Sequence, residues 1–170
     1  MWWALALQLV APARGGAQEI AELEWTRSAP LGLVGQLPGA GVDERVQIVR
    51  ALGRTRDPRA VEPLEGFADD VELSVQVAAA EALGWVSGSA DAIRRWLADT
   101  PRGSSAVLRA ALIRSLGMQG STRDLGALAD ALDEPAPVGV AAGLALGHLG
   151  QRDTPALGPA VPRLVGRLDA

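Results

Sequence analysis

The chain has 170 residues, a length that suits one domain or a short array of repeats. Apolar residues make up 48% of it and aromatic residues only 4%, so small aliphatic side chains must fill the interior. The formal net charge is −4, which argues against a nucleic-acid partner because phosphate binding needs a basic face. Cysteine is absent, and this excludes disulfides and thiolate metal sites.

The first ten residues form an apolar run with the length of a signal-peptide core, too short to span a bilayer. Small residues follow, and cleavage after Ala17 would leave Gln18 as the first residue of the mature protein. We expect residues 1–17 to be a signal peptide, residues 18–29 to be an N-terminal linker or cap, and the protein to be periplasmic or secreted, with no stable membrane insertion after cleavage. No Lys or Arg precedes the apolar run, so the alternative is a misassigned start and a cytoplasmic protein.

One short motif recurs along the rest of the chain. Ala-Leu-Gly stands at residues 51–53 and 82–84, Ser-Leu-Gly at 115–117, and Ala-Leu-Gly again at 145–147, so that the glycines lie 31, 33 and 30 residues apart. Nine residues rich in Ala, Val, Leu and Ile precede each glycine, which is typical of a buried helix that a left-handed glycine ends. Such a period predicts a stack of similar supersecondary units.

Helix-start and turn residues divide the chain into alternating outer and inner helices. Residues 30–37 predict a short first helix and residues 38–41 a turn, after which Asp43 is expected to cap the next helix. Asp57 followed by Pro58 is a second strong start signal. No segment alternates with period two, so no sheet is expected. The remaining helices are expected at residues 43–52, 57–68, 73–83, 89–98, 105–116, 121–132, 138–149 and 153–168.

Residues 57–64, the Asp69 and Asp70 turn, and residues 75–84 together resemble a HEAT repeat. More narrowly, they resemble the short HEAT-like class named after the phycobilisome lyases. Residues 160–164 repeat the pattern of residues 60–64, so the resemblance covers about residues 30–168. It implies an all-α fold, a right-handed α–α superhelix of about four to five helix pairs in residues 30–170. We expect this array to be incomplete at its C-terminal end.

The family's usual basic residue, eight positions before the glycine, is present only in alternate copies. It is Arg45 in the first copy and Arg109 in the third, whereas Gln76 and Gly139 replace it in the second and fourth. We therefore do not expect a continuous arginine ladder along the stack.

Side chains suited to catalysis are scarce in this sequence. His148 is the single histidine and tyrosine is absent, so we expect no enzyme, no metal and no cofactor. We expect His148 to lie at a helix end, favoured by the negative end of the dipole, although Asp153 is near enough in sequence to pair with it. Asp69 and Asp70 are better explained as turn residues that cap the next helix than as a catalytic pair.

Stacked helix pairs present an extended surface on which such proteins hold other proteins. We therefore predict a non-catalytic protein-binding scaffold whose partner is a protein of unknown identity. One alternative is a repeat segment of a larger exported protein. The other is a module like the phycobilin lyases, which only the family name suggests.

The candidate binding residues come from equivalent positions in the repeats. Arg50, Glu81 and Arg114 each lie three residues before a glycine, and we expect them on the concave inner face, with Gln47 nearby. Long side chains of opposite sign can meet there across about 10 Å between helices, so the row is either an ion-pair ladder or the centre of the partner surface. Trp85 follows a glycine and is a candidate exposed anchor, whereas Trp96 is expected in the core.

Overall fold

The computed structural model describes residues 30–100 and 104–152, together with single residues at 20, 158, 162 and 166. The predicted signal peptide at 1–17, nearly all of the linker at 18–29 and most of the helix predicted at 153–168 lie outside the described residues.

The described residues form helices and no strands, so the all-α prediction is confirmed. None of these helices has the length and apolar character that crossing a bilayer requires. In chain order they are α2 (Pro30–Val34), α3 (Val42–Thr55), the 3-10 turn Pro58–Ala60, α4 (Val61–Glu65), the 3-10 turn Gly66–Asp69, α5 (Leu73–Leu83), α6 (Ala90–Asp99), α7 (Ala106–Gln119), the 3-10 turn Thr122–Asp124, α8 (Leu125–Ala131) and α9 (Val138–Arg152).

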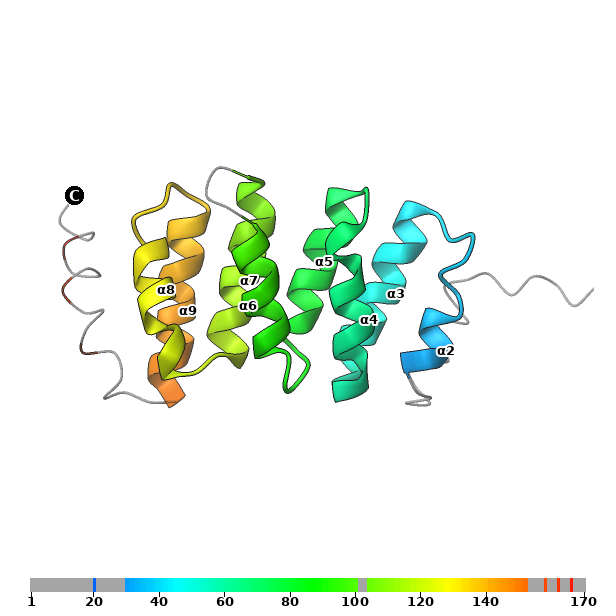
Figure 1. The fold of residues 1–170 in the computed structure, drawn as a ribbon, viewed down its shortest axis with the longest axis horizontal. Helices are drawn as coiled ribbons and strands as arrows, with labels where there is room; N and C mark the ends of the chain where they lie inside the picture. The colour runs from blue at the N-terminus through cyan, green and yellow to red at the C-terminus, as the bar shows by residue number, and fades with distance from the viewer. Residues whose placement is uncertain are drawn as a thin grey trace, which may run out of the picture.

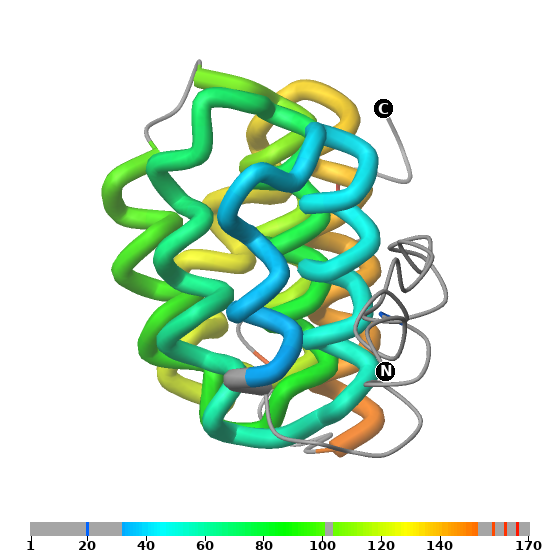
Figure 2. The backbone as a smooth tube through the Cα atoms, turned by 90° about the vertical axis from the view of Figure 1, so that its right-hand side faces the viewer, coloured from blue at the N-terminus to red at the C-terminus, as the bar shows by residue number. Residues whose placement is uncertain are grey.

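These helices stack side by side in two layers (Figure 1). The inner layer holds α3, α5, α7 and α9, each packed against the next, and the outer layer holds α2, α4, α6 and α8. Figure 2 looks along the row from the α2 end, with α3 and α9 on one side and the outer helices α4 and α6 on the other. The inner helices contact one another more extensively than α4 contacts α6. Inner helices therefore form the closely packed spine of the stack.

The core runs along the whole spine and is built from small and branched aliphatic side chains. Leu52, Leu83, Ile113 and Leu146, one from each inner helix, are all inaccessible to solvent or nearly so. The prediction that Leu83 packs between neighbouring helix pairs is therefore confirmed. Trp96 is 5% exposed, and its predicted place in the core is also confirmed.

The glycines that end each repeat motif do not stop helices in the predicted way. Gly53, Gly117 and Gly147 lie inside α3, α7 and α9, which run on beyond them. Gly84 does follow the last residue of α5, but its φ of −60° is right-handed. The left-handed helix stops were therefore a wrong prediction. The left-handed residue that ends α3 is Arg56, with φ 54°.

Close contact between inner helices explains these glycines instead. A Cβ added to Gly53 would lie 2.7 Å from the Cβ of Ala82, and one added to Gly117 would lie 2.5 Å from the Cβ of Ala145. One added to Gly84 would lie 2.8 Å from the Oγ of Ser115. Each glycine thus lets its helix come close to the next inner helix. The residue it faces there is small and stands two positions before the repeat glycine of that next helix.

The two predicted helix starts differ in outcome. Asp43 is not a cap, because α3 begins one residue earlier with Gly41 at its N-cap, and no side chain caps it. The Asp43 carboxylate lies in the first turn instead, where the helix dipole still favours it. Asp57 does cap, since its side chain accepts a 2.9 Å hydrogen bond from the backbone N–H of Arg59. Pro58 then occupies the first helical position, as predicted.

Candidate functional site

The exposed side of the inner layer carries side chains from equivalent repeat positions. Arg50, Glu81 and Arg114 come from α3, α5 and α7, three residues before each glycine, and the fourth copy has Leu144 there. Arg50 and Gln47 are exposed on α3, and the side chains of Glu81 and Arg114 are 40% and 46% exposed. The structure thus places all four predicted binding residues on accessible surface.

The expected Arg–Glu–Arg row is present in part. Nη2 of Arg114 donates to Oε1 of Glu81 at 2.9 Å. Arg50 forms no ion pair with another described residue, so the row contains one pair among the described residues. A half-exposed pair of this kind contributes about 0–1 kcal/mol to folding. The pair therefore fixes the orientation of two side chains more than it stabilises the fold.

A cavity of about 260 Å³ lies beside this pair. The Trp85 indole is 41% exposed and Leu144 is 55% exposed, so both apolar side chains border it with accessible surface. The cavity is lined by Glu81, Trp85, Arg114, Ser115, Met118, Leu144 and His148. Six of these seven residues stand three positions before or one position after a repeat glycine. The repeat itself therefore assembles the cavity from α5, α7 and α9 and the turn after α5.

Sequence reasoning missed Met118, Leu144 and His148 as lining residues, and it missed Ser115 as well. His148 was expected at a helix end, and this is wrong because α9 continues to Arg152. The histidine lies inside the helix and borders the cavity. The signal that could have found the first three is their register, since Met118 and His148 match Trp85, and Leu144 matches Arg114. The expected pairing with Asp153 lies outside the described residues.

The arginines eight positions before the glycine are structural. Nε and Nη2 of Arg109 each donate to the carboxylate of Glu134 at 2.8 Å, and Nη1 donates to the carbonyl oxygen of Thr100 at 2.7 Å. Arg45 reaches Asp70 at 3.2 Å. The side chain of Gln76 instead donates to the backbone carbonyl of Asp70 at 2.6 Å. These residues fasten inner helices to turns, and the expected break in the arginine ladder is confirmed.

Asp70 lies in the turn before α5, as predicted for the acidic pair at 69–70, but the expected capping of the next helix is wrong. No side chain caps α5, whose N-cap is Glu72, and Asp69 is the last residue of the 3-10 turn Gly66–Asp69. The carboxylate of Asp70 accepts a 2.9 Å hydrogen bond from the backbone N–H of Glu72, at the start of α5, in addition to the Arg45 contact. The Asp70 carboxylate is thus occupied with holding the chain between α4 and α5.

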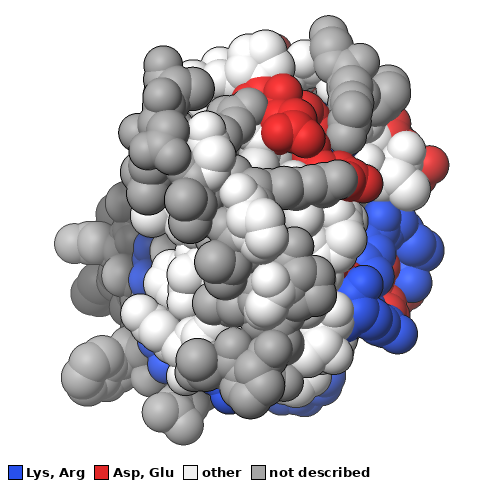
Figure 3. All heavy atoms as spheres, turned by 90° about the vertical axis from the view of Figure 1, so that its left-hand side faces the viewer, with Lys and Arg blue, Asp and Glu red and all other residues white. Residues whose placement is uncertain are grey.

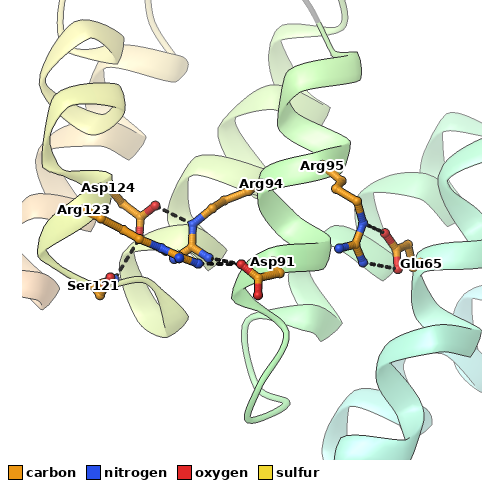
Figure 4. A network of polar contacts seen from close by, with 7 residues as sticks. All are labelled: Glu65, Asp91, Arg94, Arg95, Ser121, Arg123 and Asp124. Atoms are coloured by element: carbon orange, nitrogen blue, oxygen red, sulfur yellow. Dashed lines mark hydrogen bonds and ion pairs between the residues drawn. The ribbon is translucent and has the colours of Figure 1, made fainter.

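A second set of ion pairs joins successive outer helices (Figure 4). Nε and Nη2 of Arg95 on α6 donate to the Glu65 carboxylate on α4 at 2.8 and 2.9 Å. Arg94, on the same helix, donates in the same two-pronged way to Asp124 before α8, at 2.6 and 2.8 Å. Asp91 accepts from Arg94 and from Arg123. The outer layer is therefore linked from α4 through α6 to α8 by charge.

Asp124 is the buried member of this network, with 5% of its side chain exposed. Burial raises the pKa of its carboxyl, but hydrogen bonds from the Arg94 guanidinium and from the backbone N–H of Ser121 outweigh burial, and the pKa lies below its ordinary value. Asp124 is therefore charged at neutral pH and ties α8 to α6.

Two further hollows border the outer layer and offer less to a ligand. One, of about 500 Å³, lies beside the Glu65–Arg95 pair, and the other, of about 380 Å³, lies beside the Arg94–Asp124 pair. The charged side chains on their walls already hold the helices together. The cavity beside Trp85 is therefore the better candidate for a binding site.

Comparison with known proteins agrees with the architecture. The family model described as HEAT repeats matches residues 40–104, which span the helix pairs from α3 to α6. No curated protein matches the chain. The same two-layer arrangement continues through α7, α8 and α9. Residues 40–104 of the chain are therefore HEAT repeats.

Proposed function

We propose that this chain is a non-catalytic protein-binding scaffold, with its partner bound on the exposed side of the inner helices. The observation that carries the proposal is the cavity beside Trp85, to which α5, α7 and α9 contribute the same two repeat positions. HEAT repeats are commonly protein-interaction scaffolds, and repeat stacks in general use such extended surfaces for binding. Because fold alone does not fix function, the argument depends on the cavity.

The composition of the cavity suits an apolar side chain of a protein partner. Trp and Arg are enriched among the residues that dominate interface energies, and Trp85 and Arg114 both line this cavity. Met118 also lines the cavity, and its flexible, polarizable side chain can adapt to the shape of a partner side chain bound there. Full burial of one large aliphatic side chain contributes about 1.5–3 kcal/mol to binding.

The polar residues around the cavity would orient a bound partner. The Glu81–Arg114 pair borders the apolar walls with one acid and one guanidinium, each still partly exposed. Gln47 and Arg50 extend the surface onto α3, beyond the cavity. A partner that covers the cavity and α3 together would make apolar contacts at the centre and charged contacts at the edge, which is the usual arrangement of a protein interface.

An enzymatic alternative would use Ser115 and His148, which both line the cavity. Ser115 is 1% exposed, and its Oγ donates to the carbonyl oxygen of Ala80 at 2.7 Å. Its hydroxyl proton is thus directed to the backbone, whereas a nucleophilic serine needs a base to accept that proton. This geometry favours a structural role for Ser115 and supports the non-catalytic proposal.

The decisive experiment compares partner capture by wild type and by Trp85→Ala from an extract of the native host, with quantitative mass spectrometry as the readout. Val71→Ala is the matched control, because Val71 is 90% exposed and lies outside the cavity. We expect Trp85→Ala to lose the specific partner at an unchanged melting temperature, and Val71→Ala to retain it. Equal capture by all three proteins would contradict the proposal.

Glu81→Arg separates the two interpretations of the ion-pair row. It places two arginines opposite each other across α5 and α7. Lost stability with intact binding would show a structural ladder, and lost binding with intact stability would show that the row belongs to the partner surface.

A further inference from the structure

The cavity beside Trp85 brings together four kinds of side chain that make favourable contacts with aromatic rings. They are an indole, a guanidinium, a thioether and an imidazole, supplied by Trp85, Arg114, Met118 and His148. By burial of area alone, a large aliphatic side chain and an aromatic one both gain from entering the cavity. The chemistry of the wall therefore decides which of the two the cavity prefers.

Arg114 favours a ring through its charge. The Glu81 carboxylate holds this arginine, since Nη2 of Arg114 donates to Oε1 at 2.9 Å, and 46% of the arginine side chain is still exposed. Such a hydrogen bond lies in the plane of the guanidinium and does not use its flat faces. The face of an aromatic ring is negative and attracts a guanidinium placed over it, whereas an aliphatic side chain has no such charge distribution. Charge complementarity at Arg114 therefore distinguishes the two classes of occupant.

The other lining side chains add contacts of the same selectivity. The Trp85 indole is 41% exposed, so part of its ring is accessible for offset stacking or for an edge-to-face contact. Met118 contributes a sulfur atom, which is attracted to the edge of an aromatic ring. The imidazole of His148 is a further planar group, contributed by α9. Each of these three contacts is stronger with a ring than with an aliphatic side chain.

The size and accessibility of the cavity suit a single ring. Its volume is about 260 Å³. An apolar cavity of roughly 150 Å³ is enough to hold benzene, so a phenyl or phenol ring has room beside Trp85. Trp85 and Leu144 both border the cavity with exposed surface, so a ring can enter it from solvent.

The two hollows beside the outer helices lack this combination of side chains. Among the described residues that line the hollow of about 380 Å³, none is aromatic and none is methionine. The hollow of about 500 Å³ includes Trp96, but this side chain is only 5% exposed, and no methionine or histidine is among its described lining residues. Figure 3 looks onto the α9 end of the stack and shows arginine and acidic side chains gathered toward the right, where the outer helices lie. The outer side therefore offers ion pairs, whereas the contacts that suit a ring come together beside Trp85.

We propose that the cavity beside Trp85 binds an aromatic side chain, of Phe or Tyr, that anchors a protein partner. The inference rests on the proposed function and narrows it, because it assigns the class of residue that fills the same site. The ring contacts the Trp85 indole and the Arg114 guanidinium, and Glu81 is a positioning residue that holds the guanidinium. Aromatic residues are enriched in the cores of protein interfaces, and the residues that dominate binding tend to pair across the interface.

Titration of the isotope-labelled full chain with two small probes tests the preference for a ring. The probes are N-acetyl-phenylalaninamide and N-acetyl-leucinamide, each of which presents one side chain on a blocked backbone. The readout is the NMR signal of the Trp85 indole N–H, which is identified by its absence from the Trp85→Phe variant. We expect the phenylalanine probe to bind about 5-fold more tightly than the leucine probe, because only the ring gains the stacking and cation–π contacts.

Arg114→Gln separates charge from shape, because glutamine keeps much of the side-chain length and loses the cation. It should weaken binding of the phenylalanine probe by about 2- to 5-fold and leave binding of the leucine probe unchanged. Arg59→Gln is the matched control, since Arg59 is also an exposed arginine paired with a carboxylate, that of Asp57, and does not line the cavity. It should change the affinity for neither probe.

Three outcomes would overturn the assignment of an aromatic anchor. Equal affinity for the two probes would show that the cavity has no preference for a ring, and a Trp85 signal that moves with neither probe would show that the ring does not bind there. Free phenylalanine that binds more tightly than the blocked probe would indicate a small-molecule site instead of an anchor within a protein chain. Partner capture by wild type and by Trp85→Ala is measured separately, so the proposed function and the aromatic anchor fail separately.

Discussion

Replacing Gly117 by alanine tests whether close contact, and not a backbone angle, accounts for the repeat glycines. An added Cβ would lie 2.4 Å from the Cα of Ala145 and 2.5 Å from its Cβ. The nearest atom is backbone, so no side-chain rotation relieves the overlap. Helices α7 and α9 must move apart by about 1 Å to restore ordinary carbon–carbon separation, and a gap of that size forfeits roughly a quarter to a half of each contact's attraction.

The expected magnitude follows from two opposing effects. Overpacking of this kind costs about 1–3 kcal/mol, and a clash with backbone belongs at the upper end of that range. Alanine in place of glycine within a helix raises the free energy of unfolding by about 1 kcal/mol through its higher helix propensity. We therefore expect Gly117→Ala to lower the free energy of unfolding by about 2 kcal/mol, or the melting temperature by about 4–8 °C for a chain of this size.

Gly126→Ala is the matched control. Gly126 lies inside α8, is exposed, and an added Cβ would meet no described atom within 4 Å. Only the helix-propensity effect remains there, so this variant should be up to about 1 kcal/mol more stable than wild type. Urea unfolding followed by circular dichroism measures both changes. If Gly117→Ala proves as stable as Gly126→Ala, the close-contact explanation is refuted.

Three further predictions follow from other parts of the molecule. Leu83→Asp should abolish cooperative unfolding, because it buries an unpaired carboxylate at a fully buried site and costs several kcal/mol, and an unchanged melting temperature would contradict this. Asp124 has a lowered pKa in the folded chain, so its stabilising contribution is present above the unfolded value near 4 and is lost as the pH falls through the folded value. Asp124→Asn should therefore be less stable at pH 7 and should lose less stability than wild type in acid titration of the urea midpoint. Finally, we expect that the chain is exported and that cleavage makes Gln18 its first residue, and an intact mass from the native host that still includes residues 1–17 would exclude cleavage after Ala17.

Local sequence was sufficient to locate most helices. Residues 73–83 were predicted as a helix and are observed as α5, because an apolar run between a turn and a glycine leaves few other structures. The glycine positions were also found correctly, but with the wrong reason. A period shows that a position is constrained and does not distinguish a backbone angle from a close neighbour, because the neighbour comes from the next repeat.

The candidate site could be predicted only where the repeat positions carry opposite charges. Glu81 and Arg114 stand at equivalent positions with complementary chemistry, and their contact follows from the register. Leu144 stands in the same register without a charge, and in sequence it looks like any buried helix residue. Its exposure follows from the repeat register, since Arg50, Glu81 and Arg114 at the same position are also accessible, and only a comparison between repeats reveals it.

The two layers are held by different kinds of contact, and this gives the stack an uneven stiffness. Inner helices meet where a glycine of one faces Ala82, Ser115 or Ala145 of the next at close range, so little room is left for their spacing to change. Outer helices are joined through long arginine side chains, whose several rotatable bonds separate the paired groups from the helix backbones. The array should therefore bend mainly by changes in the spacing of the outer helices α4, α6 and α8, while the spacing of the inner helices stays nearly constant. Salt screens the exposed outer pairs, so it should soften this bending while the distances between side chains on the inner face stay fixed.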